Sequence, residues 1–181
     1  MTRQGLLAAL AFALVSSTAA AQSPSPRAED VRTIDGIIRA FYEVISGPAG
    51  TPRQWRRDST LYIPGVRFVA MSMREGRPVA SVTDHAGFVA RTDRMFVQNG
   101  FFEREIHRVT KRFGNVVHVF STYEFCQTAD GPVQGRGVNS IQLFWDGERW
   151  WIASAIWDDE RPDNPIPAEF LPPRPLRSTR P

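Results

Sequence analysis

Apolar residues recur at three- and four-residue steps in the first half of the chain. This spacing predicts amphipathic helices over residues 28–47 and 81–100. A shorter helix is predicted over 51–59, with Thr51 as a plausible N-cap, Pro52 in its first position and Trp55 as its apolar anchor. Glycine follows or closes the two longer segments, as is typical of helix ends.

From Phe101 onwards the apolar period changes to two, which is typical of strands. Four strands are predicted, over 101–113, 115–126, 136–145 and 148–158, after two short ones around 61–63 and 66–73. Short turns such as Asp146-Gly147 join the long strands, so they form an antiparallel meander. Helices followed by a meander predict an α+β fold. In it, three helices pack into a strongly curved, mostly antiparallel sheet, forming a cone that encloses a cavity.

The two ends of the chain differ in composition from the middle. Residues 1–21 combine one basic residue, a short apolar run and small residues, which is typical of a cleavable secretory signal peptide. An uncleaved anchor is the alternative, but the run is short for a membrane span. We expect a disordered spacer over 22–28, one domain over 29–171 and a Pro/Arg-rich disordered tail over 172–181. The mature protein would be periplasmic or secreted, without a transmembrane segment.

Charge and cysteine content narrow the possible partners. The chain carries a net charge of +3. Without Arg3 of the signal peptide and the three tail arginines Arg174, Arg177 and Arg180, the remainder is close to −1, so no nucleic acid partner is expected. Cys126 is the single cysteine and cannot form an internal disulfide. The histidines are not at metal-ligand spacing, and no motif predicts a metal or other cofactor.

Three segments carry a family resemblance: IIRAFYEVISG in the first helix, RFGNVVHVFSTYEF in the sheet and IQLFWDGERWWIASAIW at its end. They resemble the nuclear-transport-factor-2-like superfamily, which includes ketosteroid-isomerase-like and polyketide-cyclase-like (SnoaL-like) members. The resemblance implies the cone fold. It places the tyrosine and the two aspartates of the isomerases at Phe41, Ile63 and Ser140. All three polar groups are missing, so this chain resembles a member without the isomerase catalytic residues.

The last hairpin predicts which side chains face the cavity. A two-residue turn at Asp146-Gly147 pairs Gln142 with Trp151 and Ser140 with Ala153, and paired residues share a face. The predicted inner set is Ser140, Gln142, Trp151, Ala153, Ala155 and Trp157. The predicted outer set is Ile141, Leu143, Trp150, Ile152 and Ile156. That outer set is too apolar for water, and it predicts a homodimer that buries one face of the sheet.

The preceding hairpin has two possible registers. A three-residue turn 113–115 pairs Glu105 with Tyr123 and His107 with Ser121, whereas a two-residue turn pairs Glu105 with Glu124. The first avoids like-charge repulsion and is preferred. It collects Glu105, His107, Ser121 and Tyr123 as candidate catalytic groups, with His107 as general base. Glu103, Arg104 and Arg108 are expected on the outer face, Asp158, Asp159 and Glu160 at a solvated strand end, and His85 at the surface.

Two functions of different kinds fit these residues. The first is a small-molecule binding domain whose pocket takes a small hydrophobic or amphipathic ligand and has no catalysis of its own. The predicted pocket is formed by Phe41, Ile63, Ser121, Tyr123, Ser140, Gln142 and Trp157. The second is a lyase, isomerase or cyclase that uses His107. A dimerisation module is a third, non-enzymatic possibility.

Overall fold

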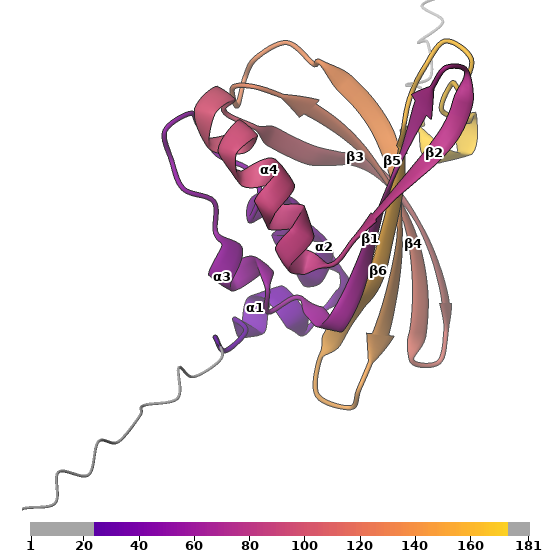
Figure 1. Cartoon of the computed structure of the whole chain (residues 1–181). Coiled ribbons are helices and arrows are strands. Elements are labelled where there is room, and N and C mark those ends of the chain that lie inside the picture. The colour runs from indigo at the N-terminus through magenta and orange to yellow at the C-terminus, as the bar shows by residue number, and fades with distance from the viewer. Residues whose placement is uncertain (1–23, 174–181) are drawn as a thin grey trace, which may run out of the picture.

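A computed structural model describes residues 24–173 as an α+β fold (Figure 1). Within that range six strands form one curved, unclosed sheet in the order β2-β1-β6-β5-β4-β3. The helices lie on its concave side. The predicted fold class is confirmed. The predicted signal peptide, the first two spacer residues and the last eight residues of the predicted tail lie outside the described residues.

The first predicted helix is two helices. They are α1 (Ala28–Val31) and α2 (Ile34–Glu43), and Thr33 between them caps α2 by accepting a hydrogen bond from Gly36 N at 2.9 Å. Gly36 is needed at this junction, because a Cβ there would lie 2.3 Å from the carbonyl oxygen of Glu29. The apolar period runs on through both helices, so it did not reveal the break between them, which Thr33 and Gly36 set.

The next two helices begin later than predicted. Helix α3 spans Trp55–Asp58, so Pro52 lies before it rather than in its first turn. Helix α4 spans His85–Asn99, and Asp84 is its N-cap, accepting from Gly87 N at 2.8 Å. Residues 81–83, with which the second of these helices was predicted to begin, instead belong to strand β2.

The strands before α4 also differ from the prediction. Strand β1 (Tyr62–Arg74) is one long strand, and strand β2 (Arg77–Thr83), which the apolar pattern did not reveal, pairs with it antiparallel. Glu75 and Gly76 join them with positive φ values of 50° and 74°, the backbone that a tight hairpin turn requires. Pro64 and Gly65 lie inside β1 where its register shifts against β6, so they bend the strand without ending it.

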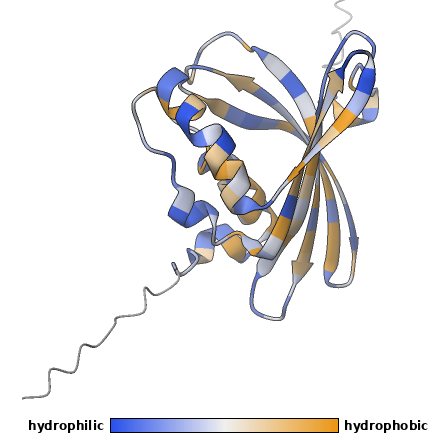
Figure 2. Ribbon diagram, viewed as in Figure 1, coloured by the Kyte–Doolittle hydropathy of each residue, from blue (hydrophilic) through white to orange (hydrophobic). Residues whose placement is uncertain are grey.

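The predicted meander is confirmed. Its strands are β3 (Phe102–Phe113), β4 (Val116–Cys126), β5 (Gly135–Trp145) and β6 (Trp150–Asp159), and each pairs antiparallel with the next. Strand β6 also pairs with β1 in parallel, which adds the first hairpin to the meander. Apolar and polar residues alternate along these strands (Figure 2).

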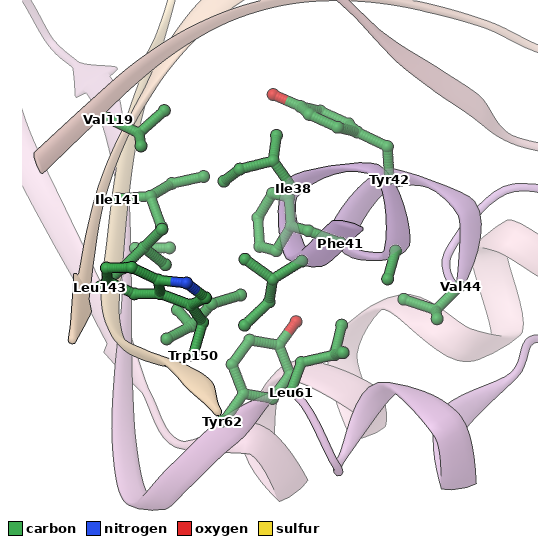
Figure 3. Close-up of a cluster of buried hydrophobic side chains, with 14 of the residues drawn as sticks. Ile38, Phe41, Tyr42, Val44, Leu61, Tyr62, Val119, Ile141, Leu143 and Trp150 are labelled. Atoms are coloured by element: carbon green, nitrogen blue, oxygen red, sulfur yellow. The ribbon is translucent and has the colours of Figure 1, made fainter. Parts of the chain in front are cut away.

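The core fills one end of the space between the helices and the concave face (Figure 3). Ile37 and Ile38 of α2 are fully buried against Ile141, Leu143 and Ile152 of the sheet, the last three at 0–1% exposure. Burying a large aliphatic side chain contributes roughly 1.5–3 kcal/mol, so this contact fixes α2 on the sheet. The outer predicted set of Ile141, Leu143, Trp150 and Ile152 is thus wrong, because all four belong to this core.

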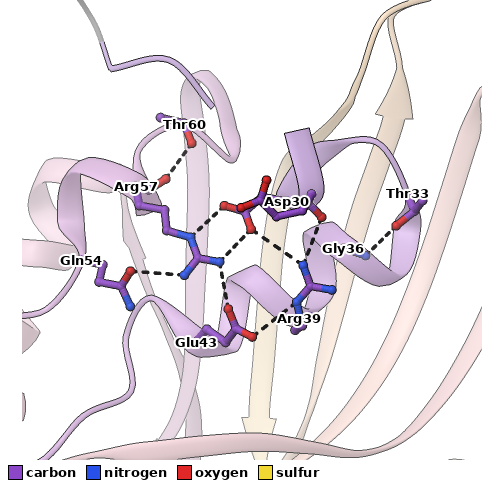
Figure 4. A network of polar contacts seen from close by, with 9 residues as sticks. Asp30, Thr33, Gly36, Arg39, Glu43, Gln54, Arg57 and Thr60 are labelled. Atoms are coloured by element: carbon purple, nitrogen blue, oxygen red, sulfur yellow. Dashed lines mark hydrogen bonds and ion pairs between the residues drawn. The ribbon is translucent and has the colours of Figure 1, made fainter. Parts of the chain in front are cut away.

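A buried carboxylate ties the first three helices together (Figure 4). Asp30 is fully buried and accepts two hydrogen bonds from Arg57, each at 2.7 Å, and Arg57 also contacts Glu43 at 2.8 Å. The bonded guanidinium of Arg57 lowers the pKa of Asp30 below its usual value. This network gives α3, a helix of four residues, a fixed position against α1 and α2.

The segment after β6 returns over the convex face. It contains the short helix η1 (Ala168–Phe170), whose Phe170 carbonyl accepts from Thr122 Oγ1 while its ring lies 5.0 Å from that of Phe120. Ile166 in the same segment is buried. Part of the convex face is therefore covered by the chain itself.

Candidate functional site

A cavity of about 300 Å³ lies between the sheet, α2 and α4. Its wall is mainly aromatic, and these side chains come from every layer: Phe41, Tyr62, Phe68, Phe88, Phe96, Phe101, Tyr123, Phe125 and Trp157. Trp157 meets Phe88 edge to face at 6.2 Å between ring centroids, and Phe96 stacks on Phe101 at 4.1 Å. Such concave, largely apolar spaces are typical of small-molecule sites.

A group of polar side chains lies on the concave face of four adjacent strands, β3, β4, β5 and β6. They are Glu103, Tyr123, Asn139 and Asp159. Tyr123 donates a hydrogen bond to Asp159 Oδ1 at 2.5 Å. Asp159 is exposed and Glu103 half-buried, so the carboxyl groups lie at the rim and on the wall of the same space.

The carboxyl group of Glu103 has a raised pKa. Burial and, to a smaller extent, the negative charge of Asp159 raise the pKa of Glu103 to about 8, although the Asn139 amide offsets part of this. Glu103 is therefore mostly protonated at neutral pH. Burial and the same Asp159 charge also raise the pKa of the Tyr123 phenol, so Tyr123 stays a neutral donor.

A chain of hydrogen bonds lies directly behind these groups. Asn139 Nδ2 donates to Tyr42 Oη at 3.1 Å, and Tyr42 Oη lies 2.6 Å from Ser121 Oγ. Ser121 in turn donates to Glu105 Oε1 at 2.5 Å, and Glu105 is paired with Arg108. Because each hydroxyl has one proton, Tyr42 donates to Ser121, and all bonds run in one direction towards the Glu105 carboxylate. This fixes the orientation of the Asn139 amide.

Three predicted pocket residues line the cavity and four do not. Phe41, Tyr123 and Trp157 are on its wall; that they contact a ligand stays a prediction. Ser121 is buried one layer behind, and Ile63 packs against the core rather than the cavity. Ser140 and Gln142 are on the convex face, where Ser140 Oγ lies 2.8 Å from His118 Nε2.

The error at Ser140 and Gln142 has one structural cause. The loop after β5 has four residues rather than two, since Trp145 pairs with Trp150, and Asp146 Oδ1 accepts from the backbone of Glu148 and Arg149. A β-bulge at Ala153 then shifts the register by one, so that Gln142 pairs with Ser154 while Leu143 pairs with Ile152. A bulge inverts side-chain parity, which is why Ala155 and Trp157 face inward as predicted, whereas Ser140, Gln142 and Trp151 do not.

A second bulge separates the predicted catalytic groups. The turn before β4 has two residues, since Phe113 pairs with Val116, contrary to the preferred register. Ile106 is skipped, so Glu105 still pairs with Tyr123 as predicted, but His107 pairs with Thr122 instead of Ser121. Thr122 bonds to η1 on the convex face, and His107 shares that face. His107 is therefore absent from the cavity wall and lies on the opposite face of the sheet from Glu105, Ser121 and Tyr123.

Apart from Tyr123, the polar residues where the cavity meets the sheet were assigned elsewhere or overlooked. Glu103 was expected on the outer face and Asp159 at a solvated strand end, and Asn139 was not considered. Arg108, also expected outside, is paired with Glu105 and with Asp35 of α2. The available signal was the spacing of Glu103 and Glu105, two residues apart in a predicted strand, which places two carboxylates on one strand face.

His85 is likewise less exposed than expected. Its Nε2 lies 2.9 Å from Asp58 Oδ2, and the other oxygen of this fully buried carboxylate accepts from Tyr62 at 2.7 Å. The contact joins α4 to the end of α3, and Tyr62 belongs to the cavity wall. This cluster supports the wall from behind.

Within residues 24–173, no three His, Cys, Asp or Glu side chains gather to hold a metal ion. None of the helices in that part of the chain is long and apolar enough to cross a membrane. Cys126 is buried at the end of β4.

Solved structures share the arrangement of the helices and the sheet. A protein of unknown function from Silicibacter pomeroyi, described as NTF-2-like, superposes with a TM-score of 0.51 at 9% identity, covering 71% of this chain and 94% of that one. The chain has the nuclear-transport-factor-2-like fold. A Nostoc punctiforme protein of unknown function with a cystatin-like fold gives a TM-score of 0.55 at 8% identity, covering 71% and 90% of the two chains.

A third solved structure has no assigned function either. It is a protein of unknown function from Mycobacterium tuberculosis, with a TM-score of 0.53 and 14% identity over 75% of each chain. No family model and no curated protein match this sequence. Identities this low show the fold alone, so function has to be argued from the cavity.

Proposed function

We propose that the protein is an exported domain that binds a small amphipathic molecule in the cavity between α2, α4 and the sheet. The observation that carries this proposal is a space of about 300 Å³ with aromatic walls and a small group of polar side chains at one side. An apolar ligand body would displace water from the aromatic wall, and Glu103, Asn139 and Asp159 would orient its polar end.

A cavity-filling substitution tests the proposal. Thr92 of α4 lines the cavity, whereas Arg94, two residues further on, is exposed. The neutral fluorophore N-phenyl-1-naphthylamine should bind the wild-type protein with a ratio of one per chain and gain fluorescence. Thr92→Trp should abolish binding, and the control Arg94→Trp should retain it. Unchanged binding by a folded Thr92→Trp protein, with folding checked by circular dichroism, would refute the site.

Export is part of the same proposal and has its own test. The composition of residues 1–21 supports a signal peptide cleaved after Ala21. Mass spectrometry of the protein recovered from the periplasm or medium of an expressing bacterium should give a mature N-terminus at Gln22. A full-length protein retained in the cytoplasm would contradict export and leave the binding proposal intact.

The acidity of Glu103 favours a second function, proton-transfer catalysis of the lyase or isomerase type. A carboxyl group with a pKa of about 8 on a largely aromatic wall can hold and release a proton near neutral pH, as acid–base chemistry requires. Turnover of an enone or lactone panel that is lost in Glu103→Gln and kept in His107→Ala would support it. Loss in His107→Ala alone would instead support the catalytic role that we predicted for His107.

A further inference from the structure

We infer that the cavity selects an organic cation, a primary amine on an apolar or aromatic body, over neutral and anionic molecules of the same shape. This inference rests on the proposed binding function and specifies the ligand class of that same cavity. Three observations support it. The charged residues of the cavity wall are acidic, the neighbouring arginines are paired with other carboxylates, and aromatic rings surround the carboxyl groups.

The charged side chains of the wall are all acidic. Glu103 and Asp159 line the cavity, and none of the lining residues in the described part of the chain is Lys, Arg or His. Neither carboxyl group forms an ion pair within residues 24–173, and Asp159 is bonded only through the neutral Tyr123 hydroxyl. The cavity therefore has negative charge that the protein does not neutralise.

The nearby arginines are committed to other carboxylates. Arg104 pairs with Glu124 at 2.5 Å, and Arg108 with Glu105 and Asp35. Arg39 pairs with Glu43 at 3.3 Å. Arg161 contacts the Asp159 backbone but pairs with Asp158 on the convex face. None of these arginines of residues 24–173 pairs with Glu103 or Asp159, and a cationic ligand would supply that partner.

The aromatic walls suit such a cation. Tyr123 and Phe125 come from β4, one of the two strands between Glu103 of β3 and Asp159 of β6, and Trp157 is two residues from Asp159 on the same face. Aromatic faces attract ammonium groups and hold apolar carbon, and a carboxylate next to them adds direct charge pairing. An anionic ligand would meet repulsion, and a neutral one would leave the Asp159 charge without a counter-ion.

Cation binding should release a proton. The titratable groups on the cavity side of Glu103 are Asp159 of β6 and Tyr123 of β4, and Tyr42 of α2 and Glu105 of β3 lie behind it. A second space on that far side is also lined by charged residues, which are Arg39, Glu43, Arg104 and Arg108. The tyrosines stay neutral because burial raises the pKa of both. Glu103 has a pKa of about 8 in the empty cavity, and an ammonium group beside it favours the charged form. Near pH 7, binding would therefore expel close to one proton from Glu103.

Three ligands of one skeleton test the inference: 2-(1-naphthyl)ethylamine, 2-(1-naphthyl)ethanol and 1-naphthylacetate. Titration calorimetry at pH 7 in phosphate and in Tris should give the order amine, alcohol, acetate, with the amine at least about tenfold tighter than the alcohol. The difference between the two buffers should show close to one proton released for the amine and none for the alcohol. Between pH 7 and pH 9 the amine affinity should rise about tenfold.

Two neighbouring residues provide matched variants. Asp159→Asn should lower the amine affinity about tenfold or more, whereas Asp158→Asn, on the opposite face, should leave it unchanged. In the double variant Glu103→Gln, Asp159→Asn the ratio of amine to alcohol affinity should approach one. A ratio that stays at its wild-type value in a folded double variant would overturn the inference.

The outcomes separate this inference from the function on which it rests. If the alcohol or the acetate binds wild type as tightly as the amine, cation selection is refuted and the binding site remains. If neither N-phenyl-1-naphthylamine nor any of the three naphthyl compounds binds, the cavity is not a binding site and both proposals fail.

Discussion

The ring of Tyr123 lies directly over Gly137 of the neighbouring strand. The two residues are register partners in β4 and β5, and a Cβ built on Gly137 would be 2.3 Å from Tyr123 Oη and 2.5 Å from its Cζ. Gly135 has the same relation to Phe125, two residues along. Two glycines in one strand thus allow two aromatic rings to lie flat across β5 at the cavity wall.

Gly137→Ala should therefore destabilise the protein. The added methyl group displaces the Tyr123 ring and its hydrogen bond to Asp159, and overpacking of this kind costs about 1–3 kcal/mol. Urea unfolding followed by circular dichroism measures the change. A glycine-to-alanine change that meets no obstacle stabilises a protein by about 0.4–1 kcal/mol, so a gain in stability would contradict the contact.

Alanine substitutions of two adjacent residues of β5 should have different effects on stability and ligand affinity, because the two side chains are on opposite faces of the sheet. Asn139→Ala removes the donor to the buried Tyr42 hydroxyl and should cost about 1–3 kcal/mol, together with a change in affinity for N-phenyl-1-naphthylamine. Ser140→Ala removes a partly exposed contact with His118 and should cost less than about 1 kcal/mol without affecting that affinity. The reverse pattern would show that the Ala153 bulge is absent in solution.

The Asp30–Arg57 pair predicts a stability difference that depends on pH. Arg57 lowers the pKa of Asp30, so the folded state binds fewer protons there than the unfolded state. The pair therefore stabilises above the unfolded pKa of about 3.9, and this stabilisation is lost as pH falls through the lower folded pKa. Asp30→Asn should cost about 3 kcal/mol at pH 7.

Unfolding free energies at pH 7 and pH 3 check this prediction. The difference between wild type and Asp30→Asn should shrink at pH 3. As a control, Glu43→Gln, whose carboxylate is 45% exposed, should cost less than about 1 kcal/mol at either pH. A deficit of Asp30→Asn that stays constant with pH would mean that Asp30 is not held as a charged partner of Arg57.

Glu103 predicts the opposite pH dependence. Its folded pKa of about 8 is above the unfolded value of about 4.3, so the folded state binds more protons and stability decreases as pH rises between these values. Glu103→Gln removes this titration. Relative to wild type, the variant should gain on the order of 2 kcal/mol between pH 5 and pH 8.5, after allowance for solvent screening. Parallel stability curves over that range would show that Glu103 is not buried as a neutral acid.

Dimerisation stays a prediction, but the apolar outer face from which it was predicted is not present in the structure. Of the apolar residues expected on the outer face, only Ile156 is outside, 42% exposed, and η1 covers another part of that face within the described residues. The period-two pattern shows that one face of β5 and β6 is apolar. It does not show whether helices of the same chain or a second chain cover that face.

The amino-acid sequence by itself determined the fold class and the order of the elements, except for the break between α1 and α2 and for strand β2. Helical periodicity, the change to period two at Phe101 and the turn residues are local signals, and each depends on neighbours within a few positions. The tertiary structure decided which groups face the cavity. Two skipped residues, Ala153 and Ile106, invert side-chain parity on either side of them, and a bulge depends on how strands pair across the sheet. That pairing brings Glu103 and Asp159, 56 positions apart in sequence, to one cavity.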